Sequence, residues 1–271
     1  MNSDSHDPVA AIGLADDADI VIDDAALVLA AADRPSVDLS KPRLWLASLA
    51  ARLAVMAGPG AGTSERTQAL VRLLFEEEGF TGDTDHYDAP ENADFLSLLK
   101  RRRGLPVTLS ILYASLARRV GWPAAPIGLP GHVILRLGGE VDPMLVDPFS
   151  GGRTLGAAGV EMLVARALGR NSRPAPQHLR PMGNREVLVR LLSNQAIRAR
   201  KGGQLERALV LSRRLTLIAP ASADLWWERA RLEQLAGDKA SARASLSAMR
   251  ETTRDPSLIA RIRAAEESLA R

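Results

Sequence analysis

Residues 104–123 read GLPVTLSILYASLARRVGWP, and this stretch decides the fold. A proline two residues after a glycine suits the first turn of a helix, where its missing N–H costs nothing. Leucine and valine then recur at the spacing of one apolar helical face. That stripe consists of Leu105, Leu109, Leu112, Leu116 and Val120. We therefore expect a helix that starts at Pro106, is buried on one face and ends at Gly121.

Two short strands are expected next, over 132–137 and 141–146, with a glycine-led turn between them. If Gly139 and Glu140 form a two-residue turn, His132 lies directly opposite Asp147. Cross-strand partners have Cβ atoms about 4.5–5.5 Å apart, so the imidazole and the carboxylate would form a hydrogen bond. Pro143 cannot donate to the ladder, and a bulge there would shift the register by one.

The rest of the chain divides into four expected segments. Residues 1–20 are acidic and show neither a helical nor a strand period, which predicts a disordered tail. Residues 21–170 form the first domain, in which the basic run 100–103 is interpreted as a solvated helix end rather than an anion site. Residues 171–185 are rich in proline, glycine and basic side chains and are expected to be a linker. Residues 186–271 have a helical pattern.

The last segment contains an internal repeat. Gly203 and Gly237 are 34 residues apart, as are Ala208 and Ala242. This period resembles that of tetratricopeptide repeats (TPRs). Trp226 occupies the usual aromatic position of the second unit, and Arg213 and Arg214 are candidates for lining a peptide groove. The alternatives are core packing for Trp226 and a solvated helix face for the two arginines.

Composition excludes several classes of function. The 271 residues include no cysteine, so there is no disulfide, thiolate metal site or cysteine nucleophile. The four histidines lack metal-ligand spacing, and no glycine-rich phosphate loop occurs, so we expect neither a metal nor a cofactor. The arginines are scattered and no long apolar run exists, which disfavours nucleic acid and membrane partners. We expect a cytoplasmic protein, and a monomer because its acidic first third can attract its basic remainder.

The motifs resemble two known families. Gly104-Leu-Pro106, the helix to Gly121-Trp-Pro123, then His132 and Asp147-Pro148 resemble transglutaminase-like cores, with Pro106 where the catalytic cysteine would stand. The chain also resembles the SirB-type family, and this resemblance rests on His86-Tyr-Asp, Asn92 and residues 102–110, 129–132 and 146–152. The resemblance implies an α+β fold: a transglutaminase-like (papain-like) core with a small antiparallel sheet, followed by TPR-like α-helical hairpins.

Pro106 bears on the function that this resemblance implies. A proline offers neither a proton to remove nor an attacking electron pair, so acyl transfer through a thioester intermediate is not possible at this position. We therefore expect a non-catalytic protein that binds an unknown protein or peptide, with His132 and Asp147 as a vestigial pair. The rival is a hydrolase or acyltransferase in which His132 activates Thr108, Ser110 or a water; Ser150 is a further nearby hydroxyl.

Overall fold

The computed structural model describes residues 7–270, which form two compact units. The first is Val21–Leu191, and the second combines the described parts of Met1–Ile20 and Leu192–Arg271. The division falls inside α8 (Asn184–Lys201), whereas the sequence predicts that the second domain starts at 186. The first turns of α8 therefore belong to the first unit.

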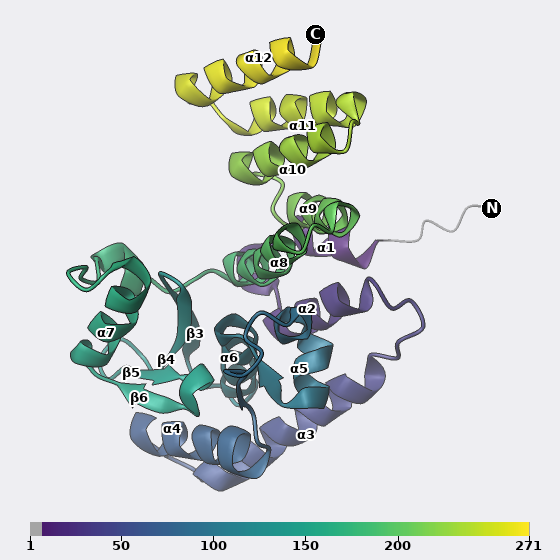
Figure 1. The fold of residues 1–271 in the computed structure, drawn as a ribbon. Helices are drawn as coiled ribbons and strands as arrows, with labels where there is room; N and C mark the ends of the chain where they lie inside the picture. Colours follow the sequence, from purple (N-terminus) through teal and green to yellow (C-terminus); the bar gives the residue numbers. More distant parts are fainter. Residues whose placement is uncertain (1–6, 271) are drawn as a thin grey trace. The chain divides into compact units, whose positions relative to one another are not determined.

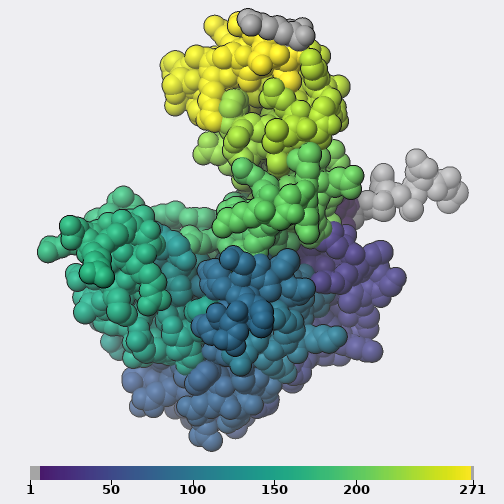
Figure 2. All heavy atoms as spheres, in the orientation of Figure 1, coloured from purple at the N-terminus to yellow at the C-terminus, as the bar shows by residue number. Residues whose placement is uncertain are grey.

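The first unit combines helices with a small sheet, as the α+β prediction requires (Figure 1). Its helices are α2 (Ile22–Ala31), α3 (Ser40–Ala57), α4 (Thr63–Val71), the π-helical turn η2 (Arg72–Glu77), α5 (Phe95–Arg101), α6 (Pro106–Arg119) and α7 (Ala157–Leu168). Short 3-10 turns are η3 (Pro90–Ala93), η4 (Pro148–Ser150) and η5 (Pro176–Leu179). The space-filling view shows one face of this unit as a continuous surface of atoms (Figure 2).

The main sheet is antiparallel with the order β3-β4-β5-β6. Its strands are β3 (Ala124–Leu129), β4 (His132–Leu137), β5 (Met144–Asp147) and β6 (Arg153–Leu155). The sequence predicted only the middle two. An isolated bridge from Ile127 to Pro181 adds to the edge at β3, so part of the expected linker 171–185 is tied to the sheet. A separate parallel pair joins β1 (Thr81–Gly82) to β2 (Arg103–Gly104).

Helix α6 is the centre of this unit. It contacts β3 and β4 on one side and α2, α3 and α5 on the other (Figure 1). The predicted helix is confirmed, but the expectation of a single buried face is wrong, because every residue from Pro106 to Ala117 is buried. A helix that is covered on all sides buries its small polar residues along with its leucines.

The register of the β4–β5 hairpin also differs from the prediction. Leu135 pairs with Val146 and Leu137 with Met144, so the turn is longer than two residues and spans 138–143. Pro143 lies in this turn, where no ladder hydrogen bond is required of it. A shift of two positions leaves His132 and Asp147 on the same face as diagonal neighbours, within reach of long side chains.

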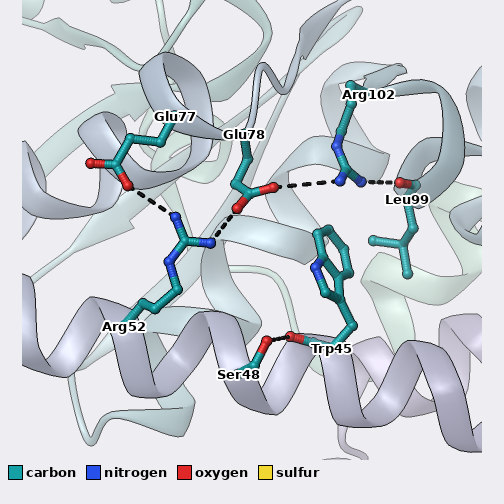
Figure 3. A network of polar contacts seen from close by, with 7 residues as sticks. All are labelled: Trp45, Ser48, Arg52, Glu77, Glu78, Leu99 and Arg102. Atoms are coloured by element: carbon teal, nitrogen blue, oxygen red, sulfur yellow. Dashed lines mark hydrogen bonds and ion pairs between the residues drawn. The ribbon is translucent and has the colours of Figure 1, made fainter.

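The basic run 100–103 is more than a solvated helix end. Arg102 caps α5 in the left-handed region, with φ 60°, and bonds the carbonyl of Leu99. Its guanidinium lies 4.4 Å from the Trp45 ring centroid and pairs with Glu78 at 3.4 Å (Figure 3). Arg52 of α3 bridges Glu78 and Glu77 in the same network. The run therefore ties α5 to α3 and to the end of η2.

The second unit is helical. It contains α1 (Pro8–Leu14), the 3-10 turn η1 (Asp17–Asp19), the latter part of α8, α9 (Leu205–Ile218), α10 (Ala223–Leu235), α11 (Lys239–Thr252) and α12 (Pro256–Ala270). Helices α9 and α11 each have 14 residues and start 34 positions apart. Gly203 and Gly237 precede them with φ 69° and 79°, left-handed conformations that suit glycine. The 34-residue period thus corresponds to equivalent helices.

The expectation of disorder over 1–20 is wrong for its described part. Asp7 caps α1 by accepting the N–H of Val9 at 2.9 Å, and Val9 and Ile12 are buried. Helix α1 packs on α9, where a Cβ on Gly13 would lie 2.0 Å from the carbonyl oxygen of Leu217. A helix of seven residues is too short to reveal its period in the sequence. Residues 1–6 of the predicted tail lie outside the described residues.

Candidate functional site

His132 and Asp147 form the predicted hydrogen bond. His132 Nε2 lies 2.9 Å from Asp147 Oδ1, and the carboxylate side chain is fully buried. Asp147 also accepts the N–H of Phe149 at 3.1 Å and the hydroxyl of Ser150 at 2.7 Å. Burial raises the pKa of Asp147, but the hydrogen bonds and charge of His132 and the bonds from Ser150 outweigh burial, so its pKa is below the usual value. Asp147 is thus an ionised carboxylate that orients the ring.

The other ring nitrogen of His132 is available for a new contact. The side chain is 14% exposed, and within residues 7–270 Nδ1 has no hydrogen-bond partner. The ring meets Phe149 edge-on, with centroids 5.8 Å apart, and Phe149 meets Tyr87 at the same centroid distance. We refer to Tyr87, His132 and Phe149 as the aromatic cluster. It offers a partly exposed aromatic surface with His132 Nδ1 and the Tyr87 hydroxyl as polar atoms.

The start of α6 carries no nucleophile. Pro106 is the first residue of the helix and is buried. Thr108 and Ser110 are fully buried, and each donates its hydroxyl to a backbone carbonyl, of Asn92 at 2.8 Å and of Val133 at 3.4 Å. The structure therefore brings His132 and Asp147 together but gives neither hydroxyl a hydrogen bond to the imidazole.

Asn92 joins the loop of the aromatic cluster to the start of α6. Its side chain is fully buried, donates to the carbonyl of His86 at 2.7 Å and accepts from Arg101 at 2.9 Å. Its own carbonyl accepts the N–H of Leu105 and the hydroxyl of Thr108. In the sequence, Asn92 is part of a motif but has no predicted role. Two of the contacts above are made by its backbone carbonyl, and the residue type does not reveal such contacts.

Gly82 completes this connection. A Cβ on Gly82 would lie 2.5 Å from the ring of Phe149, so only glycine lets β1 approach that ring. Because Gly82 pairs with Gly104, this contact connects the segment that enters α6 to the aromatic cluster.

Two further residues of the site were missed in the sequence. Arg190 donates to the carbonyls of Leu129 and His132, both at 2.8 Å, and fixes the turn that presents the imidazole. Burial lowers the pKa of its guanidinium. Tyr113 of α6 is fully buried, and within the described chain its hydroxyl has no partner. Burial, with the charge of Asp147 adding to it, raises the pKa of Tyr113 far above its usual value.

The candidates in the second unit have separate local contacts. Trp226 donates its indole N–H to the carbonyl of Pro220 at 2.7 Å and lies 5.2 Å from the guanidinium of Arg229. It also packs against the core of α10, α11 and α12. Arg213 is exposed, and its charge lowers the pKa of Asp238 after the larger effect of hydrogen bonds from Ser241. Arg214 is half-buried.

The described residues contain neither a candidate metal site nor a candidate membrane span. Over residues 7–270, acidic and histidine side chains form no group of three or more that could hold a metal ion. Within the same range, no helix has the length and apolar character needed to cross a bilayer.

Comparison with known proteins identifies relatives of this domain. The family model of the transglutaminase-like superfamily matches residues 43–193. A UPF0162 protein of Xylella fastidiosa (strain 9a5c) is 30% identical over 182 residues, 66% of this chain and 65% of that protein. The chain thus spans just under two thirds of that relative. A UPF0162 protein of Pseudomonas aeruginosa is 30% identical over 74% of this chain and 73% of its own length.

A more distant relative shares only part of the chain. Human F-box only protein 21 is 30% identical over 111 residues, 38% of this chain and 18% of that protein. No solved structure gives a significant match. The family model covers more than half of the chain, from within α3 to within α8. This chain belongs to the transglutaminase-like superfamily.

Proposed function

We propose that this transglutaminase-like domain performs no acyl transfer and instead binds a protein or peptide partner. The observation that carries the proposal is Pro106 at the first position of α6, in a domain that retains an intact His132–Asp147 pair. A histidine and its orienting carboxylate still need a nucleophile to activate, and proline supplies none.

The aromatic cluster supports a binding role. Tyr87 is 40% exposed, and Phe149 and His132 are partly exposed beside it. Aromatic side chains bury a large apolar area on contact with a partner, while His132 Nδ1 adds one directional hydrogen bond. A mainly aromatic surface with a few polar atoms suits a short peptide segment.

The hydrolase alternative has less support. Thr108 and Ser110 donate to backbone carbonyls inside the core, and Ser150 donates to Asp147 rather than to the imidazole. A nucleophile must lie within hydrogen-bond reach of its base. A water activated by His132 remains as the second candidate, and the activity experiment below addresses it.

We also propose that the second unit is a TPR-like module and that the chain is of the SirB type. Two helices of equal length at an offset of 34 residues support the first point. In this proposal Trp226, Arg213 and Arg214 contribute to partner binding.

The activity experiment compares the wild-type chain with His132→Ala. We expect no labelling of either by a serine-directed fluorophosphonate and no difference in ester hydrolysis, amide hydrolysis or amine incorporation into glutamine peptides. Labelling or turnover that disappears in His132→Ala would establish the hydrolase instead.

The binding experiment selects random displayed peptides on the immobilised full-length protein. We expect enriched peptides to lose binding to Tyr87→Ala and His132→Ala but to retain binding to the matched control His178→Ala, a histidine on η5. Peptides that bind all variants equally would place recognition elsewhere, and Trp226→Ala would then test the second unit.

A further inference from the structure

A cavity of about 410 Å³ opens on the first unit, against the sheet and the start of α7. Pocket volumes of about 300–1,000 Å³ are typical of small-molecule sites. The wall is mainly apolar, from Ile127, Leu145, Leu155 and Leu179. We call this space the α7 cavity. It is lined by neither His132 nor Asp147, so it is distinct from the candidate site above.

Arg136 gives the α7 cavity a positive charge without a counter-ion. Arg136 is one of the residues that line the cavity, and it forms no ion pair within the described residues. Its Nε is inaccessible to solvent and has no hydrogen-bond partner in that same part of the chain. None of the residues that line the cavity is acidic. A guanidinium without a counter-ion at the wall of a mainly apolar cavity favours an anionic ligand.

The start of α7 adds further donors to the same cavity. Gly156 caps this 12-residue helix without a side-chain acceptor, and Gly156 and Ala157 both line the cavity. The first N–H groups of a helix and its dipole favour an anion. A Cβ built on Gly156 would meet nothing within 4 Å, so the space beside Gly156 itself is open.

We propose that the α7 cavity binds a carboxylate attached to a small branched apolar group. The guanidinium fork and the helix N–H groups match a planar carboxylate. Its single charge costs less to desolvate among apolar side chains than the greater charge of a phosphate. The same chemistry occurs in a free short-chain acid and in the C-terminal carboxylate of a peptide that ends in leucine.

In the experiment, full-length protein is titrated with 4-methylpentanoate. Binding is measured by isothermal titration calorimetry and by the chemical shifts of backbone amides. Parallel titrations use 4-methylpentanamide and a short peptide ending in leucine, with a free or an amidated C-terminus. We expect saturable binding of a carboxylate and at least about tenfold weaker binding of its amide. Equal binding of acid and amide, or no saturation by any carboxylate, would overturn the proposal. Tighter binding of the free acid or of the peptide then shows whether the carboxylate ligand is a short-chain acid or a peptide C-terminus.

Two substitutions locate the site. Arg136→Gln removes the charge and should weaken binding at least about tenfold. Its matched control Arg173→Gln changes an exposed arginine and should leave binding unchanged.

Gly156→Asp supplies a capping carboxylate that occupies the same N–H groups, so it should abolish binding while raising the melting temperature. Because this variant is stabilised, its loss of binding cannot arise from unfolding. Unchanged binding in Gly156→Asp or Arg136→Gln would refute the site. His132→Ala should leave binding unchanged, which separates this proposal from the proposed function.

Discussion

Replacing Pro106 by cysteine would place a thiol at the first position of α6, and its reactivity would report whether the His132 imidazole serves that position. The chain has no other cysteine, so every thiol signal comes from the introduced group. Loss of the proline should cost only about 0.4–1 kcal/mol of stability, because the first N–H of a helix needs no partner within the helix. The variant should therefore fold.

The expected rate follows from the surroundings of the thiol. Free cysteine has a pKa of about 8.5, and a helix start next to a histidine lowers this value to about 6.5. At pH 6 the thiolate fraction then rises from roughly 0.3% to about 24%. The intrinsic nucleophilicity falls roughly eightfold with such a pKa, so alkylation should be about tenfold faster than for free cysteine.

The assay is iodoacetamide alkylation at pH 6, followed by mass spectrometry, with thiolate absorbance measured against pH. Ala223→Cys is the matched control, because it places a thiol at the first position of α10, another helix without a side-chain cap. Adding His132→Ala to Pro106→Cys should reduce the rate toward that of the control. The reasoning is refuted if Pro106→Cys reacts no faster than Ala223→Cys, since burial would then outweigh the helix and the imidazole.

Four further predictions concern stability. Asn92→Ala removes three part-buried hydrogen bonds of a buried carboxamide, and urea denaturation should show a loss of about 2–4 kcal/mol. Tyr113→Phe removes an unpartnered buried hydroxyl, so the same assay should show no loss, or a gain of up to about 1 kcal/mol. Because the pKa of Asp147 is lowered in the folded protein, its contribution to stability is full above about pH 4 and is lost as pH falls through the folded-state value; Asp147→Asn should flatten the stability curve below about pH 4. Gly13→Ala overpacks α1 against α9 by about 1–3 kcal/mol, so amide hydrogen exchange in α1 should accelerate about tenfold or more.

Each of these four predictions has a result that would contradict it, and two of them have a matched control substitution. A loss in Asn92→Ala no greater than that in Asn171→Ala, at an exposed site, would contradict the role of the buried carboxamide. Destabilisation by Tyr113→Phe would reveal a hidden partner for that hydroxyl. An acid transition unchanged in Asp147→Asn would mean that other carboxylates govern it. Exchange in Gly13→Ala no faster than in Gly139→Ala, where a Cβ meets nothing, would argue against the close approach.

The central helix and the His132–Asp147 contact could be predicted because each rests on a strong local pattern. Pro106 and the leucine stripe define the helix regardless of what surrounds it. The predicted contact is present although the predicted turn was too short. A shift of two positions in the register changes the residue opposite His132 but not the face of the sheet on which His132 lies. How much of α6 is buried was not predictable, since burial depends on elements far away in the sequence.

Other elements lack a signal of that kind. Strand β3 contains Pro126 and Gly128, which are unfavourable in strands, and its pairing comes from its neighbour β4. Strand β6 has three residues, too few to show alternation. The roles of Asn92 and Arg190 depend on backbone carbonyls that only the folded chain brings near them.

The contact of α1 with α9 has a consequence for how the protein assembles during synthesis. Residues 8–14 are translated about two hundred residues before the helix on which they pack. In the interval the segment Val21–Leu191 is complete and can fold. Val9 and Ile12, which are buried in the finished protein, lack their apolar partners during this time. A deletion that includes α1 would thus destabilise helices that are made much later than α1 itself.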